Sequence, residues 1–387
     1  MSASGSSRPV PCVPLRVGIL GGGQLARMTA DAARVLGVET VVLDPDTDAP
    51  AGQVTRQVVG PLEPHDALAR FARQIDVATL ENEFVHRGAL EYLAEHGVMV
   101  RPSIHTFGII MDKLHQRAHM DAAGLSPTPY AAIESPADVP AFAARHGWPV
   151  VLKTRSQGYD GRGVAIARDA GEVEAAWQRL GAGARALMAE GFVSFTHELA
   201  VMVVRNAHGD SAAYPVVETV QEEYICRVVR APAAVSPAIA EQARDVATRA
   251  IAAIEGVGVF GVELFLGTDG RVTVNELAPR PHNSGHYTID ACVASQFENH
   301  LRAVVGLPLG STSMTAPAAV MVNLIGTRSG TMDHLHTGAQ QVGDAWVHLY
   351  GKRDLRPGRK MGHVTATGAT LEEAERRAQR AADELGL

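Results

Sequence analysis

The chain is poor in the features that mark membrane and nucleic-acid-binding proteins. Its apolar stretches are cut short by glycine or charge, so none approaches the ~20 residues needed to cross a bilayer. The 35 basic side chains are outnumbered by 42 acidic ones, giving a net charge of −7. This balance excludes the broad basic surface of a nucleic-acid binder. We therefore expect a globular protein with neither a membrane nor a nucleic-acid partner.

Cysteine is also scarce. Cys12, Cys226 and Cys292 are odd in number and form no CxxC pair, which argues against a disulfide framework and a zinc site and favours a cytoplasmic location. Residues 1–14 contain serine, glycine and proline but no apolar stretch after a basic start. We expect them to be a disordered tail rather than a signal peptide.

Lysine is nearly as rare. Four of the 35 basic residues are lysines, and the rest are arginines; the four are Lys113, Lys153, Lys352 and Lys360. If most solvated lysines have been replaced by arginine, the survivors should lie where a compact point charge is needed. Chance survival is the alternative, and before their context is considered the two carry equal weight.

The pattern of apolar residues predicts several domains, since 387 residues exceed the ~100–150 of a usual domain. Over residues 15–107, short apolar runs alternate with amphipathic stretches, which predicts a Rossmann-like parallel sheet covered by helices, an α/β domain. A helix is expected over about 109–123. Residues 108–306 are predicted to form an α+β unit with a strand–loop–strand lid over about 125–193. Residues 307–387 are predicted to form a smaller α+β unit.

The first glycine-rich motif is GGGQLA at residues 21–26, between a predicted strand and a predicted helix, with Asp44 ending the next strand. This arrangement fits the dinucleotide pattern G-x-G-x-x-A with its downstream acid. The free backbone N–H groups at the helix start would suit another phosphate ester as well. A purely structural turn is the third interpretation, and the motif alone leaves all three open.

The second glycine-rich motif is GYDGRG at residues 158–163, which follows Lys153 on a predicted strand. Such a loop can fold over phosphates while the strand lysine reaches them. The Walker A pattern is absent from the sequence. A glycine-rich turn with solvated charges is the alternative to a nucleotide lid.

The strongest motif is GVELFLGTDGRVTVNELAPRP at residues 261–281. Its Asp-Gly turn predicts a hairpin, with Glu263 on one strand and Asn275 and Glu276 on the other. Carboxylates flanked by valine, leucine and phenylalanine are costly to bury without a partner, and hard oxygen ligands suit magnesium bridging nucleotide phosphates. An exposed edge hairpin is the alternative.

Three polar clusters complete the set of candidate sites. The loop PRPHNSGHYT predicts a substrate pocket, because it gathers Arg280, His282, Asn283, Ser284 and His286. The segment EGFVSFTHE, with Glu190 and Glu198, fits an inter-domain strand that reads adenine and ribose. The segment YGKRDLRPGRKMGH predicts a phosphate trap, with a solvated basic turn as the alternative; its basic residues are Lys352, Arg353, Arg356, Arg359 and Lys360.

Taken together, the strand lysine, glycine-rich lid, acidic hairpin and preceding Rossmann-like domain resemble the ATP-grasp superfamily. The motifs GILGGGQLARM, TLENE, GYDGRG, ICRxxxAPA and above all NELAPRPHNSGHYT resemble the 5-(carboxyamino)imidazole ribonucleotide synthases of purine biosynthesis, over about residues 15–365. The resemblance implies an ATP-grasp fold and an ATP-dependent carbon–nitrogen ligase. This enzyme would join bicarbonate to the exocyclic amine of 5-aminoimidazole ribonucleotide, through carboxyphosphate or the carbon dioxide it releases. A cytoplasmic homodimer, magnesium as one or two ions and transfer of the product to a downstream mutase are also implied.

The resemblance also implies a role for each motif. Catalytic contacts would come from Tyr159, Asp160, Arg162, Arg280 and His282. Magnesium would be bound by Glu263 and Glu276. ATP would be bound by Lys113, Lys153, Gly158, Tyr159, Asp160, Gly161, Arg162, Gly163, Val164, Glu190, Gly191, Phe192, Val193, Glu198, Gln221, Asn275 and Glu276. The ribonucleotide would be bound by Gly23, Gln24, Leu25, Glu81, Asn283, Ser284, Lys352 and Arg359. The chain departs from the family at Gln221, where the family often has histidine.

Other functions remain as alternatives. A formate-dependent glycinamide ribonucleotide transformylase would share the architecture but differ in the substrate loop. A nicotinamide-dependent oxidoreductase would use GGGQLA and Asp44, but it leaves the acidic hairpin and the lid unexplained. A catalytically silent nucleotide sensor is the third.

Overall fold

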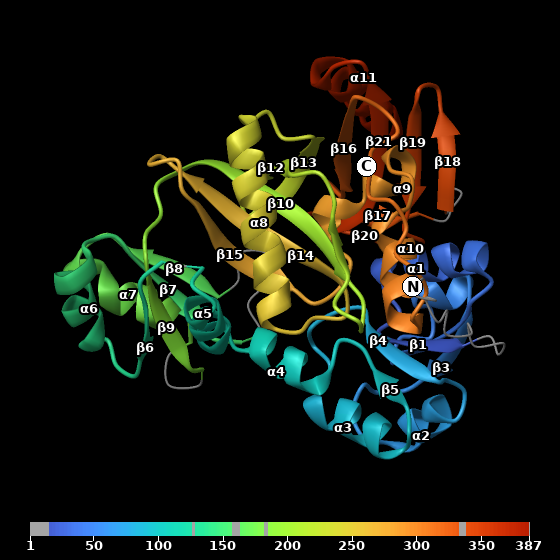
Figure 1. The fold of residues 1–387 in the computed structure, drawn as a ribbon, viewed down its shortest axis with the longest axis horizontal. Helices are drawn as coiled ribbons and strands as arrows, with labels where there is room; N and C mark the ends of the chain where they lie inside the picture. The colour runs from blue at the N-terminus through green and yellow to red at the C-terminus, as the bar shows by residue number, and fades with distance from the viewer. Residues whose placement is uncertain (1–14, 126–127, 157–162, 182–184, 333–337, 387) are drawn as a thin grey trace, which may run out of the picture.

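The computed structural model describes residues 15–125, 128–156, 163–181, 185–332 and 338–386. In Figure 1 an N-terminal unit (blue), a lid unit (green, at the left) and a C-terminal unit (red) surround a central sheet with helix α8 in front. None of the helices in the described ranges has the length and apolarity that crossing a bilayer requires.

The N-terminal unit is a five-stranded parallel sheet in the order β3-β2-β1-β4-β5. Its apolar core confirms the predicted Rossmann-like layering, because α2 and α3 pack on one face while α1 and the later helix α10 pack on the other. Its elements are β1 (Arg16–Leu20), α1 (Gln24–Leu36), β2 (Glu39–Asp44), η1 (Pro50–Gln53), β3 (Arg56–Val59), α2 (Asp66–Ala72), β4 (Val77–Leu80), α3 (Arg87–Glu95) and β5 (Met99–Val100).

The prediction of a single helix over about 109–123 is wrong, because the chain forms α4 (Ile104–Met111) and α5 (Lys113–Ala122) instead. Asp112 between them has extended backbone angles, and its side chain accepts hydrogen bonds from the N–H groups of Leu114 and His115. A capping carboxylate of this kind starts a new helix. Lys113 therefore becomes the first residue of α5.

The lid unit is a four-stranded antiparallel sheet in the order β6-β9-β7-β8. Helices α6 and α7 cover one face through a separate apolar core. The elements are β6 (Tyr130–Ile133), α6 (Asp138–His146), β7 (Val150–Thr154), β8 (Val164–Ala167), η2 (Ala170–Glu172), α7 (Val173–Arg179) and β9 (Leu187–Gly191).

A large antiparallel sheet joins the central and C-terminal units in the order β15-β14-β10-β12-β13-β16-β21-β19-β18, with β11 beside β10. The central elements are β10 (Phe195–Arg205), β11 (Ser211–Ala213), β12 (Val217–Glu222), β13 (Ile225–Ala231), α8 (Pro237–Ala253), β14 (Gly258–Gly267), β15 (Val272–Ala278), η3 (Asn283–Gly285), α9 (Thr288–Ala291) and α10 (Gln296–Val305). Helix α8 packs its apolar side on the sheet.

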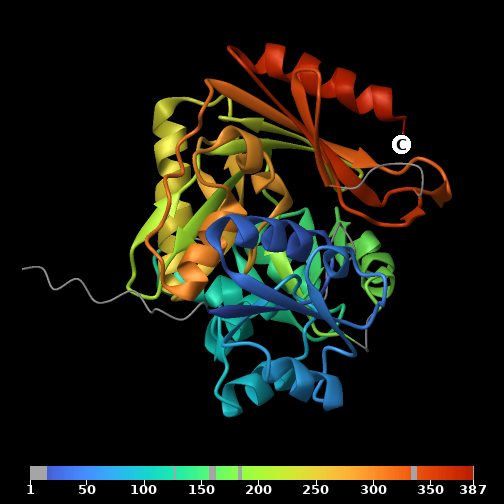
Figure 2. The ribbon, with the colours of Figure 1, turned by 90° about the vertical axis from the view of Figure 1, so that its right-hand side faces the viewer.

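The C-terminal unit continues that sheet, because β16 pairs with β13 over Val228–Ala231, while β17 and β20 form a separate two-stranded sheet. The pairing of β16 with β13 satisfies backbone groups that would otherwise form an open edge. Figure 2 shows α11 lying across these strands, on the side away from the N-terminal unit. The elements are β16 (Ala318–Ile325), β17 (Gly330–Thr331), β18 (Gly338–Val342), β19 (Ala345–Leu349), β20 (Asp354–Leu355), β21 (Lys360–Gly368) and α11 (Leu371–Leu385).

Candidate active site

A cavity of about 410 Å³ lies where the lid unit, the central sheet and the loop after β15 meet. Lysines, carboxylates and the polar loop face it together, although they come from distant parts of the sequence. Sequence-assigned residues in its lining are Lys113, Lys153, Val164, Glu190, Gly191, Phe192, Val193, Glu198, Gln221, Glu263, Asn275, Glu276, Arg280, His282, Asn283 and Ser284.

The acidic hairpin contains a bulge at its functional end. Glu263 pairs with Glu276, but the next residue on β14, Leu264, pairs with Val274. The strand β15 therefore holds one extra residue, Asn275. Neighbours on a regular strand point to opposite faces, whereas a bulge re-aims a side chain. Here both Asn275 and Glu276 face the cavity with Glu263.

The carboxylates of the cavity affect one another. Burial and the charges of Glu276 and Glu198 raise the pKa of Glu263 to about 7. Burial also acts to raise the pKa of Glu276, but the ammonium of Lys113 outweighs it and the pKa is lowered. Two facing carboxylates beside an amide oxygen are a hard, anionic donor set, and a divalent cation such as Mg²⁺ prefers such ligands. The donor set therefore fits magnesium.

Two of the three lysines that line the cavity, Lys113 and Lys153, are paired with carboxylates. Lys113 Nζ lies 2.6 Å from Glu276 Oε1. Lys153 Nζ lies 2.7 Å from Glu190 Oε2 and donates to Asn275 Oδ1 at 3.3 Å. Burial lowers the pKa of Lys153, although Glu190 opposes this effect. An ion pair thus holds each of these two lysines at the wall of the cavity.

Arg117 is a functional candidate that the sequence analysis missed. Its side chain is 2% exposed, its Nε donates to Glu190 Oε1 at 2.6 Å, and its other end donates to the Asn275 carbonyl. Burial acts to raise the pKa of Glu190, but Arg117 and Lys153 outweigh it and hold that pKa at about 2. The available signal was spacing, since Arg117 lies four residues after Lys113 and so shares its helix face.

The loop after β15 is held by charged and polar partners. Arg280 lies 2.7 Å from Glu83 Oε1, and its buried Nε has no hydrogen-bond partner in the described part of the chain. His282 contacts Ser284 Oγ at 2.8 Å and Glu263 at 3.4 Å. Burial, with Arg280 and Lys360, lowers the pKa of His282 to about 3. His282 is therefore neutral at neutral pH.

Asn283 is held by a second residue that sequence reasoning missed. Asn283 and Asn323 exchange two amide hydrogen bonds of 2.9 and 2.7 Å, and Asn323 also donates to the Cys226 carbonyl. Asn323 lies on β16, so a strand of the C-terminal unit holds the loop after β15 in place. No motif close in the sequence indicates that Asn323 contacts Asn283, because the two residues lie 40 positions apart.

The remaining assigned residues lie outside this lining. Gly158, Tyr159, Asp160, Gly161 and Arg162 fall outside the described residues. Gly163 accepts a hydrogen bond at its carbonyl from Thr154 N–H at 2.9 Å, directly before β8.

Six further residues, all assigned to the ribonucleotide, are not part of the cavity lining: Gly23, Gln24, Leu25, Glu81, Lys352 and Arg359. Burial raises the pKa of Glu81, and the positive charges of Arg280 and Lys352 partly oppose this increase. These three charged groups therefore interact electrostatically. Lys352 Nζ donates to the carbonyl of the cavity residue Lys360 at 2.8 Å. The carboxyl ends of β1 and β4 thus face the C-terminal basic segment.

Comparison with known proteins assigns the family. Three family models match in order: the ribonucleotide synthetase preATP-grasp domain over residues 15–111, the ATP-grasp domain over 118–297, and the phosphoribosylaminoimidazole carboxylase C-terminal domain over 319–377. The N5-carboxyaminoimidazole ribonucleotide synthase of Synechococcus elongatus is 42% identical, over 94% of this chain and 92% of that protein. The chain belongs to this synthase family.

Solved structures of the synthase family share the fold. The Thermus thermophilus synthetase is 40% identical, with a TM-score of 0.83 over 94% of this chain and 98% of its own. The Aspergillus clavatus synthase, solved with ADP and 5-aminoimidazole ribonucleotide, is 38% identical, with a TM-score of 0.86 over 95% and 98%. These findings confirm the ATP-grasp architecture and the ATP-dependent ligase class, and they give no support to the transformylase or oxidoreductase alternatives. The predicted domain boundaries stay a prediction.

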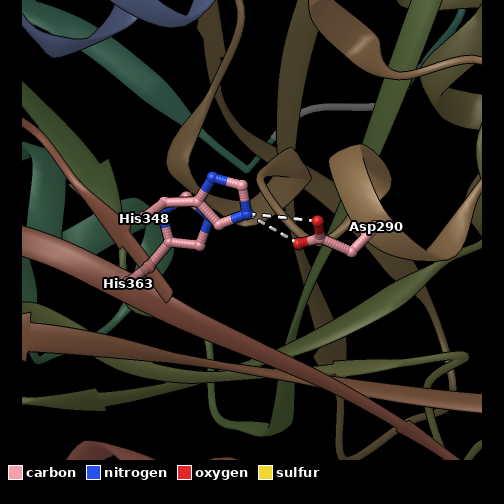
Figure 3. Close-up of side chains that lie close together, drawn as sticks. All are labelled: Asp290, His348 and His363. Atoms are coloured by element: carbon pink, nitrogen blue, oxygen red, sulfur yellow. Dashed lines mark hydrogen bonds and ion pairs between the residues drawn. The ribbon is translucent and has the colours of Figure 1, made fainter. Parts of the chain in front are cut away.

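A second cluster of metal-capable side chains in this synthase-family chain lies on α9, β19 and β21, at Asp290, His348 and His363. Figure 3 shows His348 directed at Asp290, with Nε2–oxygen distances of 3.1 and 2.9 Å. His348 and His363 are cross-strand partners, and their rings stack with centroids 4.5 Å apart and planes at 10°. Nitrogen lone pairs lie in the ring planes, so stacked rings cannot both point at one ion. This arrangement is a hydrogen-bonded junction between α9 and the C-terminal strands.

Proposed function

We propose that this chain carboxylates the exocyclic amine of 5-aminoimidazole ribonucleotide with bicarbonate and ATP, giving N5-carboxyaminoimidazole ribonucleotide in purine biosynthesis. One observation carries the proposal: an opposed pair of carboxylates, two lysines and the PRPHNSGH loop line the same cavity. The family assignment supports it, because the relatives bear the name of that reaction.

At the nucleotide end, Lys113 and Lys153 would hold the ATP phosphates, and residues 190–193 would contact adenine through their backbone. The side chain of Glu190 is already engaged by Lys153 and Arg117, so backbone groups are the part of this strand available to the base. Burial raises the pKa of Glu198, and a hydrogen bond from Gln221 opposes this effect. The carboxylate of Glu198 would accept hydrogen bonds from the ribose hydroxyls.

Glu263 and Glu276, assisted by Asn275, would bind magnesium. When bound, that ion would neutralise charge on the transferring phosphoryl group. Lys113 and Lys153 would stabilise the same charge further, because their ammonium groups lie beside Glu276 and Asn275 of the hairpin.

The reaction proceeds in two steps. A bicarbonate oxygen attacks the γ-phosphorus of ATP, the bond to ADP breaks, and carboxyphosphate forms. The amine nitrogen then attacks its carbonyl carbon, or the carbon dioxide released from it, phosphate leaves and the amine loses a proton. Arg280 would hold the bicarbonate, because its buried Nε is an unused donor in the described part of the chain. Neutral His282 would contribute a hydrogen bond rather than a charge.

The ribonucleotide would lie between the N-terminal and C-terminal units. Its phosphate would be held by Lys352 and Arg359, and its ribose phosphate would also meet Gly23, Gln24, Leu25 and Glu81. Asn283 and Ser284 would contact the aminoimidazole. The lid residues Tyr159, Asp160 and Arg162 would close over the labile intermediate, which water would otherwise destroy.

We also propose a cytoplasmic homodimer that transfers its labile product to a mutase, as the family resemblance implies. Light scattering of the purified protein would test the dimer. Coupled turnover with the mutase, compared with turnover through free product, would test the transfer.

The deciding experiment measures ADP release with ATP, magnesium and bicarbonate, with and without 5-aminoimidazole ribonucleotide. Formate with glycinamide ribonucleotide is the control pair. Release that depends on the aminoimidazole supports the proposed function. Release with formate and glycinamide ribonucleotide instead, or with neither pair, would overturn it.

A further inference from the structure

Lys113 lies directly on one of the two proposed metal ligands. Its Nζ is 2.6 Å from Glu276 Oε1, and its side chain is 13% exposed. The position is set by the fold, since Asp112 caps α5, Arg155 pairs with Asp112 and the Lys113 N–H donates to the Arg155 carbonyl at 2.8 Å. The ammonium is therefore held at the place where a cation would approach Glu276.

Lys153, which also lines the cavity, differs in this respect. Lys153 pairs with Glu190, which is also bound by Arg117 and lies on the lid strand β9. The contact of Lys153 with the acidic hairpin is a hydrogen bond of 3.3 Å to the neutral amide oxygen of Asn275, not an ion pair. A cation on the hairpin would leave the Lys153–Glu190 pair intact. Only the Lys113–Glu276 pair, of these two, has to open.

We propose that Lys113 is an internal counter-ion that blocks Glu276 in the nucleotide-free protein and is drawn away by the phosphates of ATP, so that divalent cation and nucleotide bind together. This inference rests on the proposed function, since it takes Glu276 as a metal ligand and Lys113 as a phosphate contact. An ammonium and a divalent cation compete for the same carboxylate oxygen. Phosphate oxygens offer Lys113 another anionic partner, and the resulting coupling between the two ligands is reciprocal.

The test is the affinity of the nucleotide-free protein for Mn²⁺, which takes the same carboxylate ligands as Mg²⁺, followed by the electron paramagnetic resonance signal of free Mn²⁺. A neighbouring opposite charge changes the proton affinity of a carboxylate by about 10- to 1,000-fold. We therefore expect Lys113→Met to bind Mn²⁺ at least about tenfold more tightly than the wild type. Lys153→Met is the matched control and should give a smaller increase, because Lys153 contacts the neutral amide of Asn275 on the hairpin and has its ion pair with Glu190 instead.

Two more measurements test whether the gained Mn²⁺ affinity arises at Glu276 and whether Mn²⁺ binding is coupled to nucleotide binding. Adding Glu276→Gln to Lys113→Met should remove the gained affinity. In the wild type, a non-hydrolysable ATP analogue should raise the affinity of the protein for Mn²⁺, after correction for Mn²⁺ bound to the analogue in solution. This wild-type measurement does not depend on the folding of any variant.

Three results would overturn the proposal: equal Mn²⁺ affinity in the wild type and Lys113→Met, equal gains in the two lysine variants, or no effect of the analogue. None of these measurements needs turnover. A wild type that releases ADP with the aminoimidazole but shows one of these results would keep the proposed function and lose the counter-ion. A gain in Mn²⁺ affinity in Lys113→Met without aminoimidazole-dependent ADP release would keep the counter-ion and overturn the proposed function.

Discussion

Replacing Glu190 by glutamine should loosen the attachment of the lid unit through loss of one buried charge. Glu190 on β9 is 5% exposed at its side chain and accepts from Arg117 on α5 and Lys153 on β7. Glutamine keeps the shape but leaves two buried cations without their anion. An unpaired buried charge is strongly destabilising.

The size of the effect follows from the pKa of Glu190, which lies at about 2 instead of 4.5. Each pKa unit corresponds to about 1.4 kcal/mol, so the charge contributes about 3 kcal/mol to folding at pH 7. Because the folded-state pKa is the lower one, this contribution is present above pH ~4.5 and is lost as the pH falls through ~2. The difference between wild type and Glu190→Gln should therefore shrink to about 1 kcal/mol at pH 3.

The assay is urea unfolding followed by tryptophan fluorescence, because Trp148 and Trp177 both lie in the lid unit. Glu174→Gln is the matched control, since Glu174 belongs to the same unit but is exposed. Its replacement should change the free energy of unfolding by at most about 0.5 kcal/mol. An equal loss for Glu190→Gln at pH 7 and pH 3, or no loss at pH 7, would show that the buried charge is not what stabilises the lid.

Three further outcomes are expected. Glu276→Gln should lower ADP release about 100-fold or more while circular dichroism stays unchanged, and retained turnover would remove Glu276 from the proposed metal site. Asn323→Ala should raise the KM for the aminoimidazole ribonucleotide about tenfold, because Asn283 loses two hydrogen bonds of about 1 kcal/mol or less each; an equal rise in the KM for ATP would contradict a specific effect on the loop. His348→Gln should destabilise the protein by about 2 kcal/mol, since it weakens a buried hydrogen bond to the Asp290 carboxylate, and an unchanged urea midpoint would show that this junction carries no stability.

Much of the local structure could be predicted because it depends on residues close in the sequence. Alternating apolar and amphipathic stretches define the parallel sheet of residues 15–107, and the Asp-Gly turn defines the hairpin that carries Glu263 and Glu276. The break at Asp112 was also local but was overlooked, because a capping aspartate inside a helical pattern resembles a surface residue.

The sequence by itself determined the chemical identity of the site: the acidic hairpin, the polar loop after it and the rare lysines, of which Lys113, Lys153 and Lys360 line the cavity. Only the tertiary structure decided how these groups pair. The contact of Asn323 with Asn283 and the burial of Arg117 against Glu190 join segments far apart in the chain, and the bulge at Asn275 depends on the register of the hairpin. Such contacts depend on strand register and on how units pack, and residue type does not encode which of many arginines a fold will bury.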